Sequence, residues 1–171
     1  TASAAEHPDL FWALHGGGGN FGVATAFEFQ LHPVGPLVLA GLMLWPAAAG
    51  PDVATTFRDI VEAAPEELGG AFVPLTGPPE EFVPQHLQGQ PAFAVAVCWI
   101  GDHDEGNALL GPLRALGPEA DLVGPMPYAD FQCMIDDPPG MRNYWSADYH
   151  DSFGDDALEV FVKYGSSMQS P

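Results

Sequence analysis

The chain has 171 residues, of which 23 are aspartate or glutamate and only 4 are lysine or arginine, so its formal net charge at pH 7 is -19. A surface this acidic repels the phosphate backbone, which excludes nucleic acid as an expected partner. Hydrophobic residues make up 47% of the chain, but no apolar run approaches the ~20 residues of a membrane-spanning helix, so we expect no membrane partner and a soluble protein, cytoplasmic or secreted.

The first predicted elements are a short helix, a glycine-rich turn and a strand. Pro8 and Asp9 suit the first turn of a helix, and the apolar spacing of residues 10–14 continues it. Four consecutive glycines follow at 16–19. From 21 to 31 large apolar residues alternate with small or polar ones, a period of two that predicts a half-buried strand.

The glycine run contains a dinucleotide-binding pattern that its context contradicts. Gly17, Gly19 and Gly22 satisfy the spacing G-x-G-x-x-G, but a Rossmann turn needs a strand before the glycines and a helix after them. No lysine followed by serine or threonine completes a phosphate-binding P-loop either. Two interpretations remain: a turn whose backbone amides approach a ligand closely, and a flexible connector.

The rest of the chain predicts an α+β fold. The break at 33–36 precedes these segments in chain order: strand 37–45, helix 46–65, strand 69–77, loop 78–91, strand 92–100, helix 104–116, strand 120–128, and short helices at 128–137 and 155–165. Pro112 must kink or shorten the helix that contains it. In strand 92–100 large residues alternate with small ones, which suits a sheet packed on helices on one face and closely approached on the other. This order favours an antiparallel sheet covered by helices.

Several motifs that could carry chemistry have simpler interpretations. The sequence "DHDEGN" at 102–107 lacks the later ligands of a calcium loop and predicts a turn with a helix start. Cys98 and Cys133 lie in unrelated contexts, so we expect buried free thiols and no disulfide. His150 stands between two aspartates without a third ligand, and we expect no metal site. No serine lies in a nucleophile elbow.

Three stretches resemble one known family. They are "DLFWALHGGGGNFGVATAFEFQLHPVGP", "PMPYADFQCMIDD" and "GMRNYWSADY". Together they resemble the FAD-linked oxidases of the berberine-bridge-enzyme type, in the vanillyl-alcohol-oxidase superfamily. The resemblance implies that residues 1–35 are the C-terminal segment of a PCMH-type FAD-binding domain. Residues 36–171 would be a substrate-binding domain, incomplete at its C-terminus, with an antiparallel sheet covered by helices.

The resemblance also implies site residues. Contacts to the cofactor FAD are expected from Gly18, Gly19, Asn20, Gly22 and Val23, and contacts to the substrate from Tyr144 and Trp145. The family's flavin-attachment histidine and its catalytic tyrosine or carboxylate have no match here, so the catalytic residues are unknown. Because the chain begins at Thr1, we expect it to be an internal fragment.

The sequence departs from the family pattern at three positions. His15 stands where the family has arginine, Ala24 where it has valine or isoleucine, and Ser146 where it has lysine. A histidine does not hold the permanent charge of an arginine.

The function implied is that of a parent flavoprotein. It would oxidise a C–H bond next to oxygen or nitrogen in a small molecule, such as a sugar, an alcohol or a secondary metabolite, with dioxygen as the acceptor. The expected partners are this substrate and the rest of the parent polypeptide, and the fragment alone is expected to be inactive. The alternative is a non-catalytic α+β binding or interaction domain left by a split or truncated gene.

Overall fold

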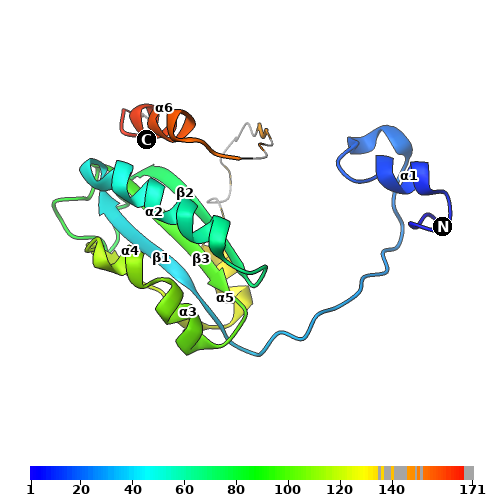
Figure 1. The fold of residues 1–171 in the computed structure, drawn as a ribbon, viewed down its shortest axis with the longest axis horizontal. Coiled ribbons are helices and arrows are strands. Elements are labelled where there is room, and N and C mark those ends of the chain that lie inside the picture. The colour runs from blue at the N-terminus through cyan, green and yellow to red at the C-terminus, as the bar shows by residue number, and fades with distance from the viewer. Residues whose placement is uncertain (135, 137–139, 141–145, 149, 151, 168–171) are drawn as a thin grey trace. The chain divides into compact units, whose positions relative to one another are not determined.

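The structure, a computed structural model, describes residues 1–134, 136, 140, 146–148, 150 and 152–167 (Figure 1). Its contacts divide the chain into two units, Thr1–Pro33 and Val34–Pro171. The boundary falls at the proline- and glycine-containing break at 33–36, where neither helix nor strand forms.

The first unit contains the predicted helix and the glycine turn. Helix α1 spans Pro8–Ala13, with proline in its first turn. A single 3₁₀ turn, η1, spans Gly18–Phe21. Between them the His15 ring lies edge-on to Phe11, and its Nδ1 donates to the Phe11 carbonyl oxygen at 2.6 Å. The prediction of a helix before the glycines is confirmed.

The predicted strand over 21–31 is not formed. Residues 22–33 form neither helix nor strand, and no described residue supplies the backbone hydrogen bonds that define a strand. The alternation itself is present, since the rings of Phe27 and Phe29 stack with centroids 5.6 Å apart. These large side chains remain uncovered, with exposed fractions of 90% for Val23 and 80% for Leu31.

The second unit is built on a five-stranded antiparallel sheet. The strand order is β2-β3-β1-β4, and β5 also pairs with β1. Each strand pair is antiparallel, and the register places Leu39 opposite Trp99 and Trp45 opposite Phe93. The strands are β1 Val38–Pro46, β2 Leu68–Thr76, β3 Pro91–Trp99, β4 Ala120–Asp121 and β5 Gly124–Met126. The antiparallel α+β fold is therefore as the sequence predicts.

Three helices cover one face of the sheet (Figure 1). They are α2 Gly50–Ala63, which follows the short turn η2 Ala47–Ala49, α3 His103–Leu109 and α4 Gly111–Ala115. The main core lies between them and the strands, and its largest fully buried members include Trp45, Met43, Val95, Leu110 and Leu113. Each such side chain contributes roughly 1.5–3 kcal/mol of hydrophobic stabilisation.

The two remaining helices lie on different faces. Helix α6, Asp155–Gly165, packs beside α2, where Leu158 and Val162 contact Phe93. Helix α5, Tyr128–Met134, covers the other face of the sheet with Phe131. None of the described helices is long and apolar enough to cross a bilayer.

Strand β3 separates large from small side chains as its sequence predicts. Val95 and Val97 belong to the core under the helices, whereas Ala94 and Ala96 face the opposite side. Cys98 is half-buried there, and burial raises the pKa of its thiol. Both cysteines are free thiols, but the expectation that Cys133 is buried is wrong. It lies two residues after Phe131 in α5, about 200° around the helix from that buried ring.

The region from 102 to 116 forms the predicted helix start and break. The Asp102 carboxylate caps α3, with its Oδ1 accepting from the backbone N–H of Asp104 at 2.9 Å and of Glu105 at 3.1 Å. The prediction of a helix start at "DHDEGN" is confirmed. The helix is interrupted at Leu110, and Pro112, which lacks a backbone donor, lies in the first turn of α4.

The charge distribution predicts that salt stabilises this fold. Four basic residues cannot neutralise 23 carboxylates. Arg58 and Arg114 already contact Asp155 at 2.6 Å and Asp121 at 2.8 Å. We expect the urea midpoint to rise with sodium chloride, mostly below about 0.3 M, because the Debye length falls from ~30 Å at 0.01 M to ~3 Å at 1 M.

The salt response distinguishes screening from salting-out. Sulfate at matched ionic strength would give the same midpoint if screening acts, but a higher one that continues to rise into the molar range if apolar burial is strengthened. A midpoint that falls with chloride, or does not move, would show that repulsion between the carboxylates is negligible.

Candidate functional site

The glycine turn is an exposed loop held by one side chain. The Asn20 amide Nδ2 donates to the Gly17 carbonyl oxygen at 3.0 Å, and this hydrogen bond links the two ends of the turn. Residues 18–23 are exposed to solvent. Because the whole stretch before Arg58 contains no lysine or arginine, an anionic group at this turn would meet backbone amides and His15 and no permanent cation from this stretch.

The chain's own geometry requires glycine at most positions of the turn. Gly16, Gly18 and Gly22 have φ angles of +90°, +65° and +126°, which L side chains rarely adopt. A Cβ at Gly17 would lie 2.2 Å from the Ala13 carbonyl oxygen. The fold itself therefore accounts for these four glycines.

Gly19 is different, because nothing in the described chain requires a glycine there. Its φ angle is not in the positive range, and a Cβ added to it would meet no atom within 4 Å. The space over this residue is open. A side chain at Gly19 would therefore obstruct only a group that approaches the turn from outside.

The predicted cofactor contacts lie together on this turn. Gly18, Gly19 and Asn20 form η1, Gly22 follows it, and Val23 begins the extended segment. Their proximity follows from chain adjacency, and their contact with FAD stays a prediction. The two predicted substrate contacts, Tyr144 and Trp145, lie outside the described residues.

Two described groups have clearly shifted pKa values, and neither is an acid or base at the turn. The carboxylates of Asp155 and Asp59 raise the pKa of Arg58 above its ordinary value. Burial raises the pKa of the Cys98 thiol. Neither shift indicates a catalytic base.

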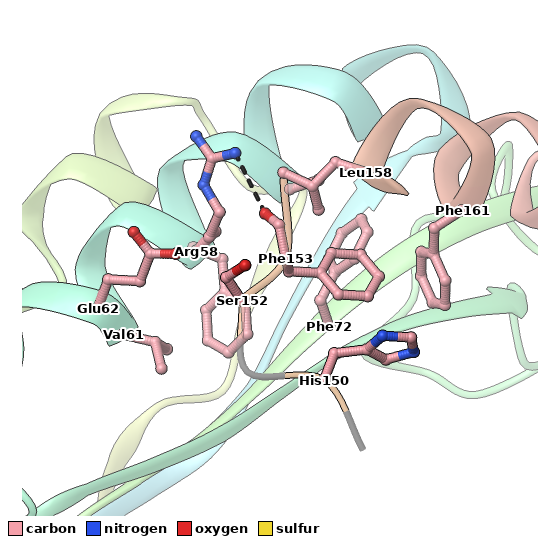
Figure 2. Close-up of a pocket in the computed structure, with 11 residues that line it drawn as sticks. Arg58, Val61, Glu62, Phe72, His150, Ser152, Phe153, Leu158 and Phe161 are labelled. Carbon is pink, nitrogen blue, oxygen red and sulfur yellow. Dashed lines mark hydrogen bonds between the residues drawn. The ribbon is translucent and has the colours of Figure 1, made fainter. Parts of the chain in front are cut away.

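A second concave feature lies on the helix side of the sheet and was not predicted from the sequence. It is a groove of about 410 Å³ between α2, β2 and the segment that leads into α6 (Figure 2). Phe57, Phe72, Phe153 and Phe161 contribute its aromatic lining. These phenylalanines are spread over a hundred positions of sequence, so no local motif indicates them.

Comparison with known proteins identifies relatives over most of the chain, although no protein-family model matches it. An FAD-linked oxidoreductase of Dictyostelium discoideum is 28% identical over 163 residues, which are 92% of this chain and 33% of that protein. The (R)-6-hydroxynicotine oxidase of Paenarthrobacter nicotinovorans is 32% identical over 112 residues, 66% of this chain and 23% of that protein.

A solved structure supports the same relationship. The crystal structure of 6-hydroxy-D-nicotine oxidase from Arthrobacter nicotinovorans superposes with a TM-score of 0.57 and 27% identity, over 78% of this chain and 28% of that one. The antiparallel sheet with its covering helices is thus a fold found in a flavoprotein oxidase of the PCMH type. The chain is homologous to the FAD-linked oxidoreductases, which confirms the resemblance seen in its sequence. It spans about a third or less of the length of these relatives.

Proposed function

We propose that this chain is part of a longer FAD-dependent oxidoreductase in which the glycine turn lies against the flavin. The observation that carries the proposal is the open space over Gly19. The described chain does not require glycine at this position, but a planar group that lies against the turn would require it. The names of the relatives, FAD-linked oxidoreductases and 6-hydroxynicotine oxidase, support flavin as that group.

In this proposal the turn binds and positions the cofactor. FAD held there would supply the hydride-accepting chemistry for oxidation of a substrate carbon next to oxygen or nitrogen, with dioxygen as the electron acceptor. The backbone of Gly18, Gly19 and Gly22 approaches it closely because no side chain intervenes. Asn20 holds the turn in shape through its bond to Gly17, and Val23 adds an apolar contact. The substrate is a small molecule.

The domain assignment is part of the same proposal. Residues 1–35 end an FAD-binding domain, and residues 36–171 form most of a substrate-binding domain. The uncovered side chains of the extended segment support this, since Phe27 and Phe29 are 72% and 73% exposed. Apolar side chains in such a row are normally covered by a neighbouring sheet.

A second function, a non-catalytic α+β binding domain, follows if no further polypeptide accompanies the chain. The observation in its favour is the partial match, which leaves at least 67% of each of the two curated relatives named above without a counterpart here. The neighbouring coding sequence separates the two proposals, because the oxidoreductase requires segments for flavin attachment and catalysis on either side.

Flavin binding tests the proposed function directly. The isolated chain is expected to be colourless after dialysis against FAD and gel filtration, because most of the cofactor pocket lies in the rest of the parent protein. The longer polypeptide is expected to be yellow and to bleach when its substrate is added without oxygen. A longer polypeptide that never retains flavin would refute the oxidoreductase proposal, and an isolated chain that retains it would refute the division of the pocket.

A further inference from the structure

The groove on the helix side of the sheet has an aromatic interior open to solvent. The rings of Phe72 and Phe161 have centroids 5.8 Å apart, and those of Phe153 and Phe161 are 6.2 Å apart (Figure 2). At the mouth, Val61 and Phe161 are 42% and 37% exposed. A concave apolar site of about 410 Å³ is within the size range of small-molecule pockets.

The charges around the groove are mostly negative. Arg58, which lines the groove together with Glu62 and His150, donates to Asp155 at 2.6 Å and to Asp59 at 2.9 and 3.0 Å. It also donates to the Phe153 carbonyl oxygen at 3.4 Å (Figure 2). These bonds hold the guanidinium at the rim, and it is already neutralised by two carboxylates. Glu62 adds a further carboxylate to the lining. Arg58 is thus accompanied by the carboxylates of Asp59 and Asp155, to which it is bonded, and by that of Glu62 in the lining.

We propose that this groove binds a small organic cation, an amine with an aromatic or aliphatic body. The body would fill the space between the phenylalanine rings, where its apolar surface is removed from water. The ammonium group would lie near Glu62 and over an aromatic face, since both attract a cation. An anion is disfavoured by the surrounding carboxylates and by the net charge of -19. None of the glycine-turn residues lines the groove.

The test is a titration of the chain with 4-phenylbutylamine and with 4-phenyl-1-butanol, which has the same body without the charge. Backbone amide NMR shifts would locate each probe, and residues 54–62 and 153–161 are expected to respond. The amine is expected to bind at least about threefold more tightly than the alcohol. Glu62→Gln is expected to weaken the amine about two- to fivefold and leave the alcohol unchanged.

Two control variants complete the test. Glu66→Gln removes the same charge outside the groove and is expected to change neither affinity. Phe161→Ala, at an exposed position, is expected to weaken both probes alike. Equal binding of amine and alcohol, an equal effect of Glu66→Gln and Glu62→Gln, or no response of residues 54–62 up to about 10 mM of either probe would each overturn the proposal.

Discussion

Replacing Gly19 by valine in the complete flavoprotein is expected to weaken FAD binding strongly while leaving the fold of this chain intact. The chain offers no obstacle to the new side chain, because a Cβ at this position meets no atom within 4 Å. An FAD ring lying against the turn would meet the valine directly. Overpacking of this kind costs ~1–3 kcal/mol, about 5- to 150-fold in the dissociation constant.

Flavin absorbance after gel filtration and a fluorescence titration measure this loss. Gly17→Ala is the contrasting variant, because its Cβ would lie 2.2 Å from the Ala13 carbonyl oxygen and must distort the turn even without a cofactor. Thermal unfolding of the second unit is expected to be unchanged in both variants. Full flavin occupancy and normal turnover in Gly19→Val would show that the turn is only a connector.

Replacing Gly41 by alanine is expected to destabilise the second unit by about 3 kcal/mol. Gly41 lies in the middle of β1 with a φ angle of +147°, and a Cβ there would lie 2.3 Å from the Leu122 carbonyl oxygen. The connection between β4 and β5 therefore runs beside β1, close enough to Gly41 that a Cβ there would clash with its backbone. In the alanine variant, either the strained φ angle and the clash persist, or the connection between β4 and β5 moves away from β1.

Urea unfolding followed by tryptophan fluorescence measures the effect, because Trp45 is fully buried and Trp99 is 5% exposed. The control is Gly111→Ala at the first residue of α4, where φ is not positive and the space is open. That change is expected to be neutral or slightly stabilising. Equal midpoints for the two alanine variants would contradict the close approach of this connection to Gly41.

The core of the second unit could be predicted because its sequence signals are local. Alternation in 92–100 specifies both faces of β3, and the stripe that includes Val53 and Ile60 specifies the buried face of α2. Asp102 and Pro112 mark helix ends by their own chemistry, a carboxylate acceptor and a missing donor. Such features do not depend on which other segment lies nearby.

Features that depend on a partner segment could not be predicted in the same way. The alternation of large and small side chains at 21–31 is typical of a strand, but a strand also needs a second strand to pair with. The described chain supplies no such strand for these residues. The groove depends on tertiary contacts between distant segments, such as the bond from Arg58 to Asp155. Cys133 was expected inside because cysteine is usually buried, yet its place on α5 is set by Phe131.

The glycine turn shows the same division within one motif. The sequence indicates the turn and its candidate contacts, Gly18, Gly19, Asn20, Gly22 and Val23. It cannot separate the glycines that the backbone requires from the one that it does not. That separation needs the φ angles and the positions of neighbouring atoms, which identify Gly19 as the position where a ligand would matter most.

Amide hydrogen exchange of the longer polypeptide, with and without FAD, tests the contact between turn and flavin most directly. Residues 18–23 are exposed here, so a flavin lying against them is expected to slow the exchange of their backbone amides by at least about tenfold. The amides of α3 and α4 serve as the internal reference and are expected to be unchanged. A yellow, FAD-loaded protein whose residues 18–23 exchange at the same rate as in the flavin-free form would contradict the account.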